Sequence, residues 1–103
     1  SVIKNNLRFG TIYVDGKYTQ DDEFLTLSSS LSILAKGKKA YFVAESENNM
    51  PVIINVKSNG RFIKKLIVKS PKLYKIAELK IHEIKSLSLK INRNLRVYSF
   101  SFE

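Results

Sequence analysis

The sequence predicts an all-β domain, either a sandwich or a barrel. Short runs of alternating apolar and polar residues recur along the chain, and turn signals separate them about every ten residues. The 103 residues are 44% apolar and 26% charged, as is typical of one small globular domain with its own core. We therefore expect a single domain over residues 1–103.

The first strong signal is TIYVDGKYTQ, residues 11–20. Two β-prone runs flank Asp15 and Gly16, the residue types that a two-residue type I′ turn requires. A hairpin with this turn would place Tyr13 opposite Tyr18 as an aromatic cross-strand pair. The acidic residues that follow predict a turn before the runs FLTLSS, LSILAKG and KKAYFVAES.

Two further runs follow a break at ENNMP. VIINVK, residues 52–57, directs alternating apolar residues to one side, which we expect to be the interior. Asn59-Gly60 predicts a second tight turn, from which RFIKKLIVK continues. The alternation slips at Lys64-Lys65, which indicates a bulge or a bend at this point.

The last run, RVYSFSFE, places Tyr98, Phe100 and Phe102 on one face, an aromatic stripe of period two that is typical of a core. The stretch before it, residues 72–91, is ambiguous. Its first half has apolar residues at helical spacing, whereas SLSLKI alternates as a strand does. The pattern alone leaves both a helix and a strand open over residues 72–86.

Several short segments occur in a characteristic order: GKYTQDDEFLTL, KKAYFVAES, VKSNGRF, KLYKIAEL with a following His82, and the terminal LRVYSFSFE. In this order they resemble the small C-terminal domain that follows the thioredoxin-like domain in DipZ-type thiol-disulfide proteins. The likeness spans Phe9 to Glu103. The sequence departs from the family pattern at Tyr18, where the family favours Trp, at Asn59, where it favours Asp, and at Glu103, where Gly would end the chain.

The resemblance implies a small antiparallel jelly-roll-like β-sandwich, similar to a carbohydrate-binding module, at the C-terminal end of a longer thioredoxin-like protein. It also implies that KLYKIAEL is a strand and that HEIKS is a turn. Either Leu73, Ala77 and Leu79, or Tyr74 and Ile76, would then face the interior. An extracytoplasmic location, in the periplasm or cell envelope, follows from the same resemblance.

Positive charge is concentrated in the second part of the chain. Residues 1–56 carry six basic and six acidic side chains, whereas residues 57–96 carry twelve basic ones against Glu78 and Glu83, a local net charge of +10. Lysines between apolar residues are typical of solvated strand faces and protected sheet edges. The asymmetry also favours an acidic partner: a polyanionic glycan or other cell-envelope polyanion, a membrane surface or, less strongly, nucleic acid.

The chain offers little catalytic chemistry. It lacks cysteine, which excludes disulfides, thiolate metal sites and thiol redox chemistry within this sequence. His82 is the only histidine, no G-x-S-x-G motif occurs, and the four glycines are isolated, so we expect no phosphate-binding loop. Asp21, Asp22 and Glu23 are contiguous and would point apart, which favours an acidic turn over a calcium site. We expect no enzymatic activity, cofactor or metal; any redox activity would belong to a preceding thioredoxin-like domain.

Tyrosines are the candidate ligand-binding aromatics. Sugar rings stack on flat aromatic faces, and tyrosine adds a polar tip that contacts hydroxyl groups. Tyr13, Tyr18, Tyr41 and Tyr74 are candidates for this role, although each also fits a core position. No run of about 20 apolar residues that could cross a bilayer is present.

The basic candidates are Arg61, Lys64 and Lys65, within RFIKKLIVKSPKLYKI. This segment interleaves cations with Phe62 and Tyr74, as a surface that binds single-stranded nucleic acid does, but no recognised nucleic-acid motif accompanies it. A third interpretation is docking on a neighbouring thioredoxin-like domain, whose acidic patch the basic side would complement.

Overall fold

The computed structural model describes residues 2–4, 11–15 and 17–103, and the regular elements in this part of the chain are antiparallel β-strands. The strands are β1 Val2–Lys4, β2 Thr11–Asp15, β3 Tyr18–Gln20, β4 Leu25–Leu27, β5 Ser30–Ser46, β6 Val52–Ser58, β7 Arg61–Val68, β8 Lys72–Ile91 and β9 Leu95–Phe102. The described residues contain no helix long and apolar enough to cross a membrane. The all-β prediction is confirmed.

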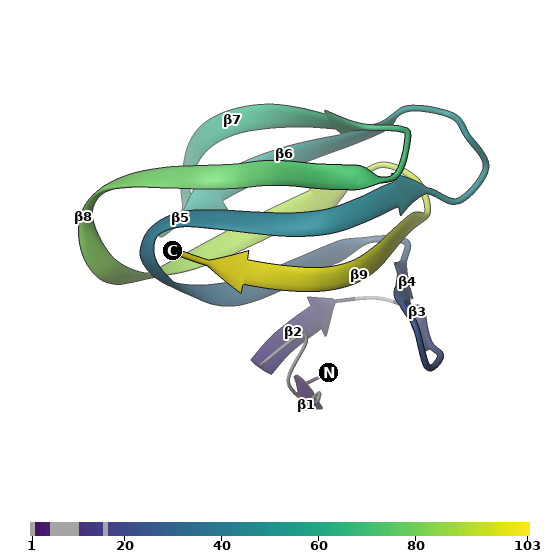
Figure 1. The fold of residues 1–103 in the computed structure, drawn as a ribbon, viewed down its shortest axis with the longest axis horizontal. Coiled ribbons are helices and arrows are strands. Elements are labelled where there is room, and N and C mark those ends of the chain that lie inside the picture. The colour runs from purple at the N-terminus through teal and green to yellow at the C-terminus, as the bar shows by residue number, and fades with distance from the viewer. Residues whose placement is uncertain (1, 5–10, 16) are drawn as a thin grey trace.

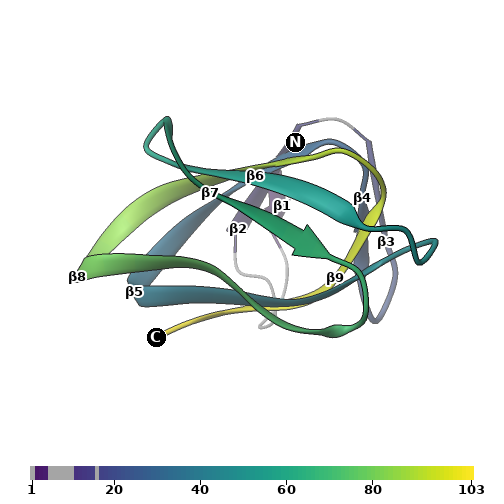
Figure 2. The same ribbon diagram turned by 90° about the horizontal axis from the view of Figure 1, so that it is seen from above.

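Two long strands organise the molecule. β5 and β8 pair along most of their length and turn back together at one end, so that each contributes to both layers of a sandwich (Figures 1 and 2). The first sheet contains β3, β4, β9, the second half of β5 and the first half of β8. The second sheet contains β1, β2, the first half of β5, the second half of β8, β6 and β7. The predicted β-sandwich is therefore present.

The bend in β5 lies at Gly37, whose φ of 99° is in the left-handed region. The pairing of β5 with β8 is interrupted between Gly37 and Lys39. The backbone of Glu103 fills the space beside Gly37, and its carbonyl oxygen accepts hydrogen bonds from the N–H groups of Lys38, at 2.5 Å, and Lys39, at 3.1 Å. The residue after β9 is thus tied into the bend.

The core lies between the two sheets. The alternation of β6 works as predicted, because its apolar residues at positions 52, 54 and 56 are fully buried. Phe42 of β5 packs in the core, with its ring centroid 6.2 Å from that of Tyr74 and 5.9 Å from that of Phe100. The largest fully buried side chains are Phe42, Leu25, Leu27, Leu31, Ile54, Ile76, Leu87, Leu89, Leu95, Val52 and Val56.

Residues 72–91 form one strand, β8, so the strand interpretation of KLYKIAEL is confirmed. Of the two sets of interior residues, Tyr74 and Ile76 are buried, whereas Leu73 is 57% exposed, and the side chain of Leu79 lies outside the described part of the structure. Ala77 is buried as well, because the pairing with β5 shifts register near this point. The prediction that HEIKS forms a turn is wrong: the strand continues through it while it crosses from one sheet to the other.

The predicted hairpin at Asp15-Gly16 is not formed. Gly16 lies outside the described residues, but β2 pairs with β1 and β5 rather than with β3. The backbone of Tyr13 lies opposite Val2 and Ser32, and Tyr18 lies opposite Leu27. Tyr13 and Tyr18 therefore are not a cross-strand pair, because tertiary pairing overrides the local turn signal.

The other turn predictions are closer to the structure. Asn59 and Gly60, with φ of 50° and 82°, connect β6 to β7 as predicted. The bulge lies at Ile63, one residue before the predicted position, since the pairing passes from Val56 with Lys64 to Lys57 with Phe62. The acidic turn at residues 21–23 is also present and closes the β3–β4 hairpin.

The aromatic stripe predicted for β9 is only partly correct. Leu95 and Val97 are buried, and then the buried face changes so that Phe100 follows them inward. The change is caused by a bulge at Tyr98, since Ser99 pairs with Val43 while Val97 pairs with the next residue of β5. Tyr98 is consequently half-buried, and Phe102 lies at the surface.

Candidate functional site

Tyr74 is a core residue and not a surface for ligand stacking. Its side chain is 7% exposed and packs edge-on against Phe42. Its hydroxyl donates to the carbonyl of Ser70 at 2.6 Å and accepts from the N–H of Lys69 at 3.1 Å. Both hydrogen bonds hold the loop between β7 and β8 against the sandwich, which is how a buried tyrosine satisfies its polar end.

The other predicted tyrosines lie apart from one another. Tyr18, 36% exposed, is on the short edge strand β3 and borders a hollow at one end of the sandwich. Tyr41 is on the outer face of the first sheet, where its hydroxyl lies 3.4 Å from Glu103 Oε2. The side chain of Tyr13 lies outside the described part of the structure, but its backbone position is on β2, opposite Ser32.

The predicted basic residues Arg61, Lys64 and Lys65 are all on β7, but their side chains do not form one surface. Lys65 pairs with Asn55 and is exposed on the outer face of the second sheet. Lys64 pairs with the buried Val56, so it is on the interior side of the edge strand. Its ammonium group donates to the carbonyl of Lys75 in the first sheet at 3.0 Å and bridges the two layers. Arg61 is exposed at the turn after β6.

The cations and aromatic rings interleaved in RFIKKLIVKSPKLYKI therefore do not lie on one face. Besides the inward Lys64 and the buried Tyr74, Lys75 is paired with Glu78, with Nζ 2.8 Å from Oε1. The hydrogen bond and the attraction between these charges raise the pKa of Lys75 and lower the pKa of Glu78. Lys72 lies over the Tyr74 ring, 5.0 Å from its centroid.

The structure instead assembles two polar rows on the outer face of the second sheet. The first row runs from Ser32 to Ser88, Lys57 and Phe62 on the neighbouring strands β5, β8, β6 and β7. The second runs beside it through Ser30, Lys90, Asn55 and Lys65 on the same strands. Residues between these positions, such as Leu31, Leu89 and Val56, are buried. Along these stretches of β5, β8 and β6, alternation thus separates buried apolar side chains from polar side chains that face outward.

A groove of about 550 Å³ lies over these rows. We define it by its lining residues, which are Ser30, Leu31, Ser32, Asn55, Lys57, Phe62, Ser88, Leu89 and Lys90. Phe62, 55% exposed, is the aromatic member at one end. The charged side chains that line the groove are both cationic, Lys57 and Lys90. No group of three or more potential metal ligands forms among the described residues.

Sequence reasoning named Phe62 in the nucleic-acid interpretation but did not identify the other lining residues. The signal was present in the serines of SLSI and SLSLK, which occupy every second position and therefore share a face with Lys90. However, local alternation does not show which strands are neighbours. Bringing Ser32, Ser88 and Lys57 into one row requires pairings between segments far apart in the chain.

The sequence matches no family model and no curated protein. Its fold is similar to part of a family two carbohydrate esterase from Clostridium thermocellum, solved in complex with cellohexaose, with a TM-score of 0.77 and 14% identity over 89% of this chain and 31% of the esterase. A family two carbohydrate esterase from Cellvibrio japonicus gives a TM-score of 0.66 and 14% identity, over 86% of this chain and 29% of that one. An acetyl xylan esterase from the rumen bacterium Butyrivibrio proteoclasticus gives a TM-score of 0.66 and 15% identity, over 100% of this chain and 31% of that esterase. The chain spans about a third of the length of these proteins and shares a β-sandwich fold with that part of them.

Proposed function

We propose that this chain is a non-catalytic module that binds an extended, acidic glycan weakly in the groove. The observation that carries the proposal is the register of the two rows. It places hydroxyl, amide and ammonium groups side by side on four neighbouring strands and ends one row at the exposed ring of Phe62. Hydroxyl and amide groups exchange hydrogen bonds with sugar hydroxyls, an aromatic ring stacks on a sugar face, and ammonium groups bind carboxylates.

Shape and charge support this ligand class. Adjacent strands lie about 4.8 Å apart, so a row over four strands is about 14 Å long, enough for a chain of several sugar rings. Lys57 and Lys90 favour a ligand with carboxylate groups, such as a polyuronate. Because both are exposed, their contribution is screened by salt and the binding is weak. The cellohexaose complex of the Clostridium esterase makes oligosaccharides the first ligands to test. A cell-envelope location, where such glycans occur, agrees with this proposal.

Titration of isotope-labelled protein with an oligogalacturonate tests the proposal. We expect amide shifts at Asn55, Lys57 and Ser88, with an affinity that falls between about 50 and about 200 mM salt. Lys57→Gln and Phe62→Ala should each weaken binding about tenfold, or about 1.4 kcal/mol. Lys69→Gln, which removes the same charge beyond the far end of β7, should not. No shift at the groove, or equal affinity for all three variants, would overturn the proposal. Tighter binding of an oligothymidylate than of the glycan would favour nucleic acid instead.

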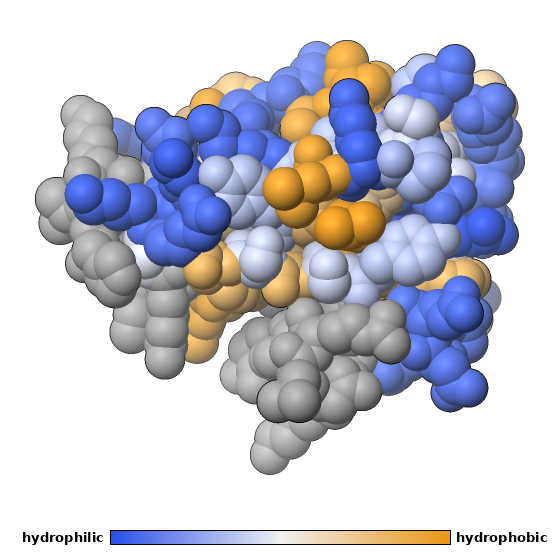
Figure 3. Space-filling model, viewed as in Figure 1, coloured by the Kyte–Doolittle hydropathy of each residue, from blue (hydrophilic) through white to orange (hydrophobic). Residues whose placement is uncertain are grey.

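A second candidate function is docking on a neighbouring domain, which the family resemblance implies is thioredoxin-like. The observation in its favour is an apolar patch on the outer face of the first sheet, over β8 and β5 (Figure 3). Leu73, 57% exposed, lies there opposite Val43. A Leu73→Glu variant that retained glycan binding but lost association with that domain would separate the two functions.

A further inference from the structure

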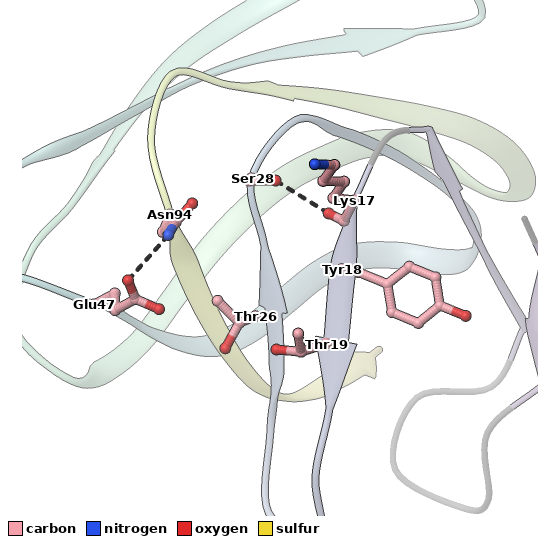
Figure 4. A pocket seen from close by; sticks show the side chains of 7 residues that line it. All are labelled: Lys17, Tyr18, Thr19, Thr26, Ser28, Glu47 and Asn94. Atoms are coloured by element: carbon pink, nitrogen blue, oxygen red, sulfur yellow. Dashed lines mark hydrogen bonds between the residues drawn. The ribbon is translucent and has the colours of Figure 1, made fainter.

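A second hollow lies at one end of the sandwich, on a different part of the surface from the groove. Its volume is about 510 Å³, within the range of small-molecule sites. The β3–β4 hairpin forms one wall, and the loops that precede β6 and β9 form the other (Figure 4). The lining residues are Lys17, Tyr18, Thr19, Thr26, Ser28, Glu47 and Asn94.

We propose that this hollow is a second binding site, for an uncharged polyhydroxylated ligand of the size of a terminal sugar unit. The charges here are balanced, with one ammonium group on Lys17 and one carboxylate on Glu47, whereas those of the groove are positive. The other polar groups are the hydroxyls of Thr19, Thr26 and Ser28 and the amide of Asn94. Neighbouring hydroxyl, carboxylate and amide groups are the partners that adjacent sugar hydroxyls require, since each hydroxyl both donates and accepts.

Three of the polar groups, on Glu47, Asn94 and Ser28, are held in place by hydrogen bonds within the protein. Asn94 Nδ2 donates to Glu47 Oε1 at 2.9 Å, and the backbone N–H of Glu47 donates to the Asn94 carbonyl at 3.4 Å, so the two loops are joined (Figure 4). On the opposite wall, at the β3–β4 hairpin, the hydroxyl of Ser28 donates to the carbonyl of Lys17 at 3.1 Å. Glu47 Oε2 and Asn94 Oδ1 accept no hydrogen bond from the described residues, which leaves both oxygens for ligand hydroxyls. A site fixed before binding loses less entropy when the ligand arrives.

Recognition in the hollow depends on hydrogen bonds rather than on stacking. Figure 4 shows the ring of Tyr18 directed away from Glu47 and Asn94, on the other side of β3 from the side chain of Thr19. Among the lining residues, no aromatic face therefore lies opposite the polar groups. We expect binding to be weak and, because the ligand is uncharged, insensitive to salt.

Cellohexaose is a suitable uncharged probe, followed by amide shifts in isotope-labelled protein. We expect shifts at Thr26, Ser28 and Asn94 that are equal at low and high salt. Glu47→Gln and Thr26→Val should each weaken binding about tenfold, whereas Glu78→Gln, which makes the same charge change on β8, should leave it unchanged. Thermal melting shows whether a variant has an altered fold. If Glu47→Gln disturbs the loops, the affinity of the Thr26→Val variant alone tests the site.

Three results would overturn the second site: no shift at the hollow, shifts confined to the groove, or wild-type affinity in the Thr26→Val variant. The outcome is independent of the proposed function, because the acidic glycan is tested on different residues. If the oligogalacturonate shifts the groove and cellohexaose shifts nothing, the groove stands and the hollow fails. If only cellohexaose binds, at Thr26 and Asn94, the hollow stands and the groove fails.

Discussion

The backbone carbonyl of Glu103 occupies the space that a side chain on Gly37 would need. Gly37 also has φ of 99°, a conformation that residues with a Cβ rarely adopt. Gly37→Ala should therefore lower the free energy of unfolding by more than the about 1–3 kcal/mol typical of backbone strain alone. Gly60→Ala is the matched control, because φ there is 82° but no atom lies within 4 Å of an added Cβ. Chemical denaturation measures both, and equal losses would contradict the importance of the Glu103 contact.

The structure assigns Tyr74 to the core, and removal of its hydroxyl tests this. Tyr74→Phe leaves the N–H of Lys69 and the carbonyl of Ser70 without their partner, so we expect a loss of about 1–3 kcal/mol in unfolding free energy. Tyr18→Phe, at an exposed position, should change it by less than about 0.5 kcal/mol. A Tyr74→Phe variant with unchanged stability but weaker glycan binding would restore Tyr74 as a ligand residue.

Lys64 and Lys65 are adjacent in sequence but should respond differently to substitution. An inward charge on an edge strand opposes pairing with another chain, and Lys64 also satisfies the Lys75 carbonyl of the facing sheet. Lys64→Ala should therefore promote self-association, visible as a concentration-dependent rise in sedimentation coefficient, with little change in glycan affinity. Lys65→Ala should remain monomeric and bind the oligogalacturonate more weakly. The opposite pattern would show that Lys64 faces the groove.

The Tyr98 hydroxyl donates to Glu45 Oε2 at 2.5 Å. This hydrogen bond, assisted by burial and by the negative charge of Glu45, raises the pKa of Tyr98. A folded-state pKa above the unfolded value means that the contribution to stability is complete below about pH 10 and is lost as the pH rises through the raised pKa. Absorbance titration should show a late ionisation that Tyr98→Phe removes. In Glu45→Gln the transition should move to lower pH; no movement would exclude Glu45 as the cause.

The sequence allowed the strands to be predicted but not the arrangement of their faces. Alternation located β6 and the turn at Asn59-Gly60, because both are properties of neighbouring residues. The slip at Lys64-Lys65 indicated the bulge that lies at Ile63, whereas the bulge at Tyr98 had no such signal and exchanges the inward and outward faces of β9 beyond it, so period-two reasoning failed there. The groove escaped prediction for a related reason: its rows depend on pairing between residues about sixty positions apart, such as Ser30 with Lys90.

The passage of β5 and β8 through both layers has a consequence for cooperativity. In a sandwich whose sheets share no strand, one sheet can open while the other persists. Here, separation of β5 from β8 would break hydrogen bonds in both sheets at once. Hydrogen exchange should therefore report a single protected unit that includes residues 31–35 and 40–44 alike. A ligand bound in the groove should slow hydrogen exchange in the first sheet as well, although it contacts only the second sheet.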